Sequence, residues 1–150
     1  MKRLGVTTAL LATLCSSSCS GPSQYLRSSE GPWLTYGRTM CFGPCPAFTL
    51  EVDRDGAARF NGRAHVRHEG AHVAQWPTEF LETAALRAHA VDLAGHAGRY
   101  DNPMIMDLPA KTLSMGGHEI YDRYGAPDMG ALYQTLDSLI SLTDWQPAGH

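Results

Sequence analysis

The chain has 150 residues, of which 43% are hydrophobic, 9% aromatic and 18% charged, and its 12 basic and 15 acidic side chains give a formal charge of -3. These values are typical of one soluble globular domain, and they exclude fibrous, low-complexity and strongly basic nucleic-acid-binding chains. The sequence contains no basic stripe that would follow a phosphate backbone. We therefore expect no nucleic-acid partner.

The N-terminus has the three parts of a secretory signal peptide. A basic start with Lys2 and Arg3 precedes an apolar stretch from 4 to 14, and small residues follow up to Ser18. The apolar stretch is too short to cross a bilayer, which takes about 20 residues. We predict that residues 1–18 are a signal peptide and that the mature protein lies outside the cytoplasm, in the cell envelope.

Cys19 resembles the cysteine that is lipidated in bacterial lipoproteins, because the small residue Ser18 precedes it, whereas bulky Leu14 precedes Cys15. The match is incomplete, since Ser16 stands where such signals usually carry Leu or Val. Two outcomes stay open. Either Cys19 carries a lipid anchor that makes the membrane a partner, or ordinary cleavage yields a periplasmic or secreted protein.

Composition divides the remaining chain into three parts. Residues 19–32 are rich in Ser, Gly and Pro, which is typical of a flexible tether. Residues 33–146 carry the periodic apolar patterns of a single domain, and residues 147–150 form a short tail.

Two hairpins and one further strand are predicted from alternation and turn residues. Apolar and polar residues alternate from Phe48 to Phe60 around Asp55-Gly56, and the second hairpin spans 111 to 124 around Gly116-Gly117. A strand from 64 to 74, broken or bulged at Gly70, lies between them. Asp53 and Asp55 fall at the first hairpin tip, where turn chemistry accounts for both acids.

Two helices complete the pattern. The first begins at Thr78, which is a suitable cap, and stops near Gly95; the second begins at Pro127 and is pinned at its end by Trp145. The stretch from 98 to 109 lacks periodicity and is predicted to be a long loop. The order βββαββα indicates an α+β fold, an antiparallel sheet of about five strands with two helices on one face.

Cys41 and Cys45 are the cysteine pair of the predicted domain. An oxidising compartment favours a disulfide between them, and closing this short loop stabilises the fold by about 2 kcal/mol on the chain-entropy model. A thiol-disulfide redox function is the alternative. Catalytic dithiols, however, have two intervening residues and a following helix, whereas this pair has three intervening residues and is followed by a predicted strand.

The chain carries the motif Cys41-Phe42-Gly43-Pro44-Cys45-Pro46, then the 48–60 hairpin, Gly70, Asp107-Leu108-Pro109 and the stretch from Tyr121 to Pro127. Together these features resemble the bacterial extracytoplasmic family named domain of unknown function 6438. The resemblance extends from about Trp33 to Trp145. It implies a secreted or lipid-anchored location and the same order of elements. It implies no activity and no catalytic residues. The histidines around position 68 depart from the family pattern.

His65, His68 and His72 suggest a metal site only if their segment is helical. On the predicted strand His65 points away from His68, and His68 lies about 13 Å from His72, too far to share a zinc ion. We therefore predict no metal site and no cofactor here, and interpret the segment as an exposed strand rich in His and Arg.

The sequence offers soft ligands for copper at Met104, Met106, Met115 and His118, so a copper-binding envelope protein is a second alternative. Methionines more often fill gaps in a core. Asp107, Ser114, His118 and Asp122 form no recognisable catalytic motif, and the sequence has no nucleophile elbow, zinc-protease helix or phosphate-binding glycine loop. The sequence thus favours a non-catalytic module that binds an envelope partner or serves as an accessory domain.

Overall fold

The computed structural model describes residues 21–26 and 30–149. The predicted signal peptide and Cys19 lie outside the described residues. The domain is built on one sheet with the strand order β5-β7-β6-β1-β2-β3-β4-β8. Its strands are β1 (Leu34–Arg38), β2 (Ala47–Val52), β3 (Ala57–Ala64), β4 (Gly70–Gln75), β5 (Gly98–Tyr100), β6 (Lys111–Met115), β7 (His118–Asp122) and β8 (Gln146–Pro147).

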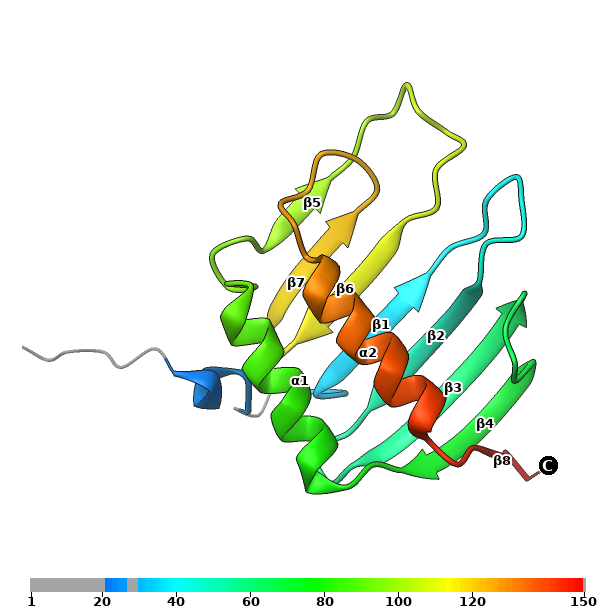
Figure 1. Cartoon of the computed structure of the whole chain (residues 1–150), viewed down its shortest axis with the longest axis vertical. Helices are drawn as coiled ribbons and strands as arrows, with labels where there is room; N and C mark the ends of the chain where they lie inside the picture. The colour runs from blue at the N-terminus through cyan, green and yellow to red at the C-terminus, as the bar shows by residue number, and fades with distance from the viewer. Residues whose placement is uncertain (1–20, 27–29, 150) are drawn as a thin grey trace, which may run out of the picture.

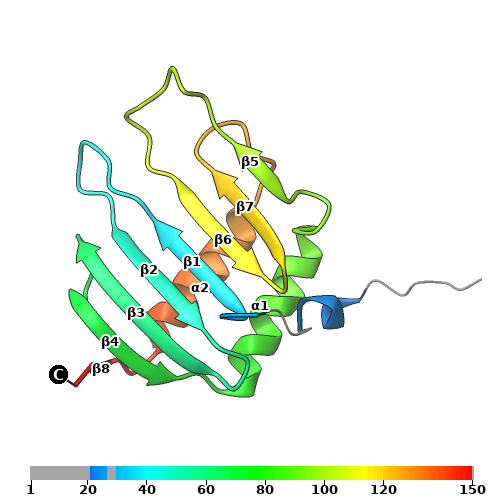
Figure 2. The ribbon, with the colours of Figure 1, turned by 180° about the vertical axis from the view of Figure 1, so that it is seen from behind.

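Two helices, α1 (Thr78–Ala90) and α2 (Gly130–Leu142), lie side by side on one face of the sheet, and the other face is uncovered (Figures 1 and 2). A short 3-10 helix, η1 (Pro22–Leu26), packs beside α1. None of the helices within the described ranges is long and apolar enough to cross a membrane. The α+β class and both hairpins are confirmed.

The predicted number of strands and the prediction of a purely antiparallel sheet are wrong. The sheet has eight strands rather than about five, and β5 runs parallel to β7. The additional strands, β1, β5 and β8, have only five, three and two residues, too few for alternation to stand out in the sequence. β5 lies in the predicted loop, and β8 draws the predicted tail into the sheet by pairing Pro147 with His72.

β1 is the strand on which the sheet is centred, because it pairs antiparallel with both β2 and β6. Its residues Leu34 and Tyr36 face the helices and are fully buried. Gly37 points to the open face, where a Cβ atom would lie 2.8 Å from the hydroxyl of Thr112. Arg38, a charged residue, occupies the next core-facing position after Tyr36, so the apolar alternation has only two members and the strand was missed in the sequence.

The core lies between the sheet and the two helices and is rich in aromatic rings. Phe48 on β2 contacts Phe60 on β3, with ring centres 5.2 Å apart, and Phe60 contacts Trp145 at 5.3 Å. The Trp145 indole also donates a hydrogen bond to the carbonyl of Ile140 at 3.0 Å. Trp145 therefore pins the end of α2 to the sheet, as the sequence predicts.

The helix ends differ from the sequence expectations. Thr78 makes no capping hydrogen bond, and α1 ends at Ala90 instead of continuing to Gly95. α2 begins at Gly130, three residues after Pro127, and Asp128 accepts a hydrogen bond from the Gly130 amide at 2.8 Å. Asp128 thus satisfies one of the amides that a helix N-terminus leaves unpaired.

The segment predicted to be a flexible tether, residues 19–32, is packed in part. Tyr25 of η1 is fully buried in the core. Its carbonyl accepts a hydrogen bond from the Trp33 indole, and its hydroxyl accepts one from the Ala94 amide at 3.1 Å. The stretch is rich in Ser and Pro, and the ring of Tyr25 is its buried anchor in the core. Composition alone therefore gave the wrong prediction for residues 22–26.

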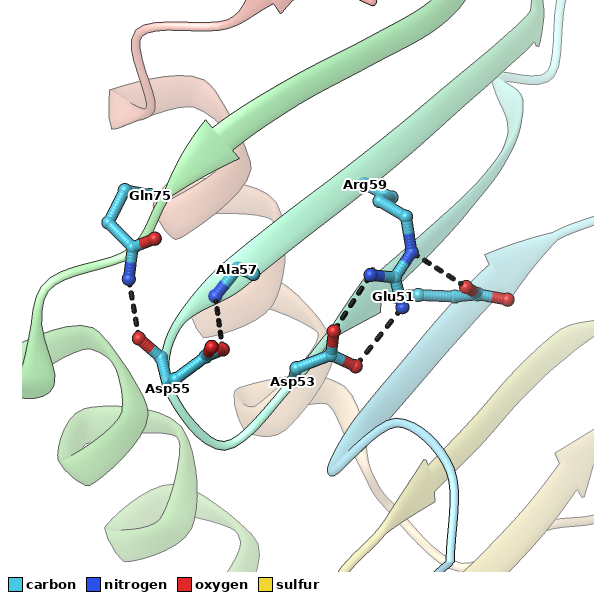
Figure 3. Close-up of polar contacts among 6 residues, drawn as sticks. All are labelled: Glu51, Asp53, Asp55, Ala57, Arg59 and Gln75. Atoms are coloured by element: carbon cyan, nitrogen blue, oxygen red, sulfur yellow. Dashed lines mark hydrogen bonds and ion pairs between the residues drawn. The ribbon is translucent and has the colours of Figure 1, made fainter.

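The Asp-Gly turn between β2 and β3 is held by side chains, as Figure 3 shows. The Arg59 guanidinium donates two hydrogen bonds to the carboxylate of Asp53, at 2.8 and 3.1 Å, and one to Glu51 at 3.2 Å. These hydrogen bonds lower the pKa of Asp53. Asp55 accepts a hydrogen bond from the Ala57 amide at 3.0 Å, so turn chemistry accounts for Asp55, whereas the Asp53 carboxylate pairs with Arg59 on β3.

Candidate functional site

Several loops meet at one end of the sheet, which we call the loop end. Arg38, the last residue of β1, pairs with Lys111, the first residue of β6, and Lys111 pairs with Asp122, the last residue of β7. The loops that connect these strands onward are 39–46, 101–110 and 123–129, and they lie at the top of Figure 1. The 65–69 turn is at the same end, because Ala47 pairs with Ala64.

The loop end carries most of the large hydrophobic side chains that are exposed in the described part of the chain. Among residues 21–26 and 30–149, nine large hydrophobic side chains are exposed. Six of the nine belong to the three loops: Met40, Phe42, Met104, Met106, Leu108 and Tyr124. Phe42, between the two cysteines, is 92% exposed. Soluble domains keep large apolar side chains in water at such density mainly where a partner binds.

A cavity of about 250 Å³ opens beside these loops, between the sheet and the C-terminal half of α2. Apolar groups form most of its wall, and polar side chains from β1, the 65–69 turn and α2 complete it. Its lining comprises Arg38, Pro46, Phe48, Phe60, His65, Val66, Arg67, His68, Asp137, Ile140 and Ser141. Apolar walls with a few convergent polar groups are typical of a ligand or side-chain pocket.

The polar part of the cavity is organised by an ion pair between Arg38 and Asp137. The Arg38 Nε also donates a hydrogen bond to the hydroxyl of Tyr36 at 2.9 Å, and this hydroxyl donates to Asp137 at 3.2 Å. The pair is partly shielded from water, with side-chain exposures of 21% for Arg38 and 39% for Asp137. Alternation on β1 turns Arg38 toward α2, so the charge must find a partner there.

Burial controls the protonation of this cluster. Burial raises the pKa of Tyr36, and the nearby Asp137 carboxylate raises it further. Burial also raises the pKa of Asp137, although Arg38 opposes the shift. Tyr36 therefore remains a neutral hydrogen-bonding group at physiological pH rather than a base. The cluster offers hydrogen bonds and a paired charge to a ligand, but no activated nucleophile.

A second tyrosine extends the cluster toward β6. Tyr133 of α2 stacks on Tyr36 with ring centres 5.9 Å apart, and the Lys111 ammonium lies 4.9 Å from the centre of the Tyr133 ring. The Tyr133 hydroxyl is buried and has no hydrogen-bond partner among the described residues. Burial and then the carboxylate of Asp122 raise its pKa.

A larger depression, of about 470 Å³, lies on the uncovered face of the sheet. It is lined by outward-facing side chains of β1, β6 and β7, and Arg99 of β5 stacks over the ring of Tyr121 at 3.8 Å. We place the candidate site at the loop end instead, because there an apolar cavity, a shielded ion pair and exposed apolar side chains occur together.

Cys41 and Cys45 lie within the loop end, in loop 39–46. Their sulfur atoms are at bonding distance, and their Cα atoms are 5.7 Å apart, in the ordinary range for a disulfide. The amide of Gly43 donates a hydrogen bond to the sulfur of Cys41 at 3.2 Å. Strand β2 begins just after Cys45, so the helix N-terminus that activates catalytic dithiols does not follow this pair.

The structure corrects the geometry expected for the histidines. β4 begins only at Gly70, so His65 and His68 belong to a turn rather than to a strand. The turn folds back, and the rings of His68 and His72 lie 5.3 Å apart rather than about 13 Å. Among the residues that the structure describes, no group of three or more His, Cys, Asp or Glu side chains is arranged to hold a metal ion.

The proposed copper ligands are not brought together. Met104 and Met106 are exposed in loop 101–110 at the loop end. Met115 is buried next to the β6–β7 turn at the opposite end, where the ring of His118 lies 5.5 Å from that of Tyr25. Ser114 points to the sheet face opposite to His118, because the strand partner of His118 is Met115. Asp122, at the other end of β7, and Asp107, in loop 101–110, lie at the loop end and do not converge with His118.

Sequence reasoning missed the Arg38–Asp137 pair, whose members are 99 positions apart. The sequence contains one signal of a partly buried carboxylate in the last helix. Tyr133 and Asp137 are separated by four residues and so share the buried side of the last helix, which places a carboxylate where only an apolar stripe was noted. The partner of that carboxylate could not be identified without β1.

We predict that Asp137→Ala lowers the free energy of unfolding by about 1–2 kcal/mol, because Arg38 and the Tyr36 hydroxyl lose their shared acceptor in a partly shielded site. Urea denaturation measures this change. Asp144→Ala is the matched control, since Asp144 is exposed and should cost less than about 0.5 kcal/mol. Equal effects of the two substitutions would contradict a structural role for the pair.

The comparisons with known proteins identify a family. Neither a curated protein nor a solved structure matches the chain. The family model described as domain of unknown function (DUF6438) matches residues 32–140, from the residue before Trp33 into α2. This match confirms the resemblance seen in the sequence. It covers more than half of the chain, and the chain therefore belongs to the DUF6438 family.

Proposed function

We propose that the chain is a non-catalytic binding module of the bacterial cell envelope, anchored to a membrane through a lipid on Cys19, that docks an envelope protein with its loop end. The observation that carries the proposal is the clustering of six of the nine exposed large hydrophobic side chains in three loops at that end. The family match supports an unassigned biochemical role and brings no catalytic residues.

The extracytoplasmic location is supported by two features. The N-terminal residues have the order of a signal peptide, with a basic start, an apolar stretch and small residues before Cys19. Cys41 and Cys45 are at disulfide-bonding distance, which suits an oxidising compartment. A disulfide between Cys41 and Cys45 would close a short loop around Phe42, which is 92% exposed.

The position of η1 supports a defined orientation at the membrane. η1 begins at Pro22, only three positions after Cys19, and three extended residues span about 10 Å. The backbone of Tyr25 in η1 lies against Gly116 of the β6–β7 turn, at the end of the sheet opposite the loops. A lipid on Cys19 would therefore hold that end near the bilayer and direct the loop end away from it.

The chemistry of the loop end suits a protein partner with apolar side chains. Methionine and aromatic residues are enriched in protein interfaces, and Met side chains adapt to the shape of the partner. The cavity beside Pro46 is large enough for one apolar side chain of that partner, and Arg38 and Asp137 at its wall are available for polar contacts. A partner that docks at the loop end would cover Phe42.

The anchor is tested by intact mass spectrometry of the protein purified from its native envelope, before and after reduction and alkylation. We expect a mature chain that begins at Cys19 with added acyl mass, and Cys41 and Cys45 that react only after reduction. An unlipidated chain with freely alkylated Cys41 and Cys45 would contradict the proposal and favour the thiol-disulfide alternative.

The docking surface is tested by photocrosslinking in cells, with a photoreactive amino acid at Phe42 or Met104. Leu86 on α1 and Leu142 at the end of α2 are matched controls, because both are large, apolar and exposed but lie away from the loop end. We expect a discrete protein adduct from the two loop positions only. Adducts from the control positions alone would place the interface elsewhere.

A further inference from the structure

We propose that His68 and His72 form a two-histidine site for a divalent transition-metal ion such as Zn²⁺, at the edge of the cavity. The site does not depend on the proposed anchor, and it borders the docking surface, because His68 also lines the cavity. It rests on side-chain geometry that the sequence could not show, because the turn after β3 returns the chain onto β4 and brings two rings together that a continuous strand would separate.

The spacing of the rings fits shared coordination. Zinc is held about 2.1 Å from an imidazole nitrogen, which puts each ring centre roughly 3.2 Å from the metal and two tetrahedrally placed ring centres roughly 5.2 Å apart. The His68 and His72 ring centres are 5.3 Å apart with an interplanar angle of 62°. Histidine rotates readily about its second side-chain torsion, so small rotations aim both nitrogens at one point.

The hydrogen bonding of His72 leaves the correct nitrogen free. Its Nδ1 lies 3.3 Å from the carbonyl oxygen of Gly70, to which it donates when it carries the proton. That bond places the lone pair of the neutral ring on Nε2, which is the usual arrangement of a metal-bound histidine. No hydrogen bond engages the His68 ring among the described residues, so its nitrogens are also available.

The backbone around the pair is constrained, which keeps the two rings near each other. Gly62 of β3 pairs with Gly70 of β4, and a Cβ atom on Gly62 would collide with the carbonyl oxygen of His68. His72 lies within β4 and His68 two residues before that strand. The two ligands therefore sit on one ordered hairpin, and binding needs little further ordering of the chain.

Two protein ligands leave coordination positions for water or for another group. His68 also lines the cavity, so these open positions lie at its edge and are accessible to a small ligand or a donor atom of a partner. The flanking charges, Arg67 and Glu69, are both exposed and opposite in sign. Imidazole nitrogens suit zinc, copper(II) and nickel, and we use zinc as the probe.

The test is isothermal titration of the full, disulfide-bonded chain with zinc chloride, together with a long-range ¹H–¹⁵N spectrum of the imidazoles. We expect one saturable site of micromolar affinity and zinc-dependent shifts of the Nε2 atom of His72 and of one ring nitrogen of His68. Because the spectrum is recorded on the unmodified chain, it tests the site without a variant that might disturb the fold.

Substitution then assigns the ligands. His68→Gln and His72→Gln should each weaken zinc binding at least about tenfold, whereas the control His89→Gln, at an exposed position on α1, should leave the affinity unchanged. The proposal is overturned if zinc shows no saturable uptake in the micromolar range, or if the affinity survives replacement of both His68 and His72.

Discussion

The pairing of β1 along both of its edges is the constraint on which the rest of the structure depends. β2 and β6 hold β1 in register from Leu34 to Arg38. Successive side chains of a strand point to opposite faces, so a slip by one residue would turn Leu34, Tyr36 and Arg38 out of the core together. The register thus places an arginine under α2, where Asp137 pairs with it. The shielded ion pair follows from that register.

The same strand runs between two ends of the sheet that differ in composition. At its start, Trp33 and Tyr25 fasten η1 to the domain. At its end, the chain enters loop 39–46, and the neighbouring strands β6 and β7 lead from loop 101–110 and into loop 123–129. η1 and the apolar loops are therefore separated by the length of the sheet, which is the separation that the proposed anchor and docking surface require.

Local pattern predicted the parts of the fold in which periodicity runs long enough. Both hairpins, the two helices and the position of Trp145 followed from alternation, turn glycines and apolar stripes. β1 was missed because Arg38 ends its apolar alternation after two residues, and β5 because three residues at a sheet edge carry no period. Residues 22–26 escaped because one buried tyrosine outweighed a polar composition.

The candidate site could be predicted less well from the sequence, because strand pairing brings together segments that are distant along the chain. The exposed apolar residues of loops 39–46 and 101–110 can be recognised as parts of one surface only when β1 and β6 are known to be neighbours. The separation assumed for His68 and His72 was wrong because it required an unbroken strand, whereas β4 starts only at Gly70. In each case the decisive fact is a pairing between distant segments.

We propose that a lipid on Cys19 would anchor the chain with its loop end facing away from the membrane. The most direct measurement couples a chain that begins at Cys19, through the Cys19 sulfur, to a lipid in a nanodisc that contains gadolinium-bearing headgroups, and records the loss of amide NMR signals. The account predicts strong broadening in η1 and at the Gly116-Gly117 turn, with loops 39–46 and 101–110 unaffected. Broadening of those loops instead would contradict it.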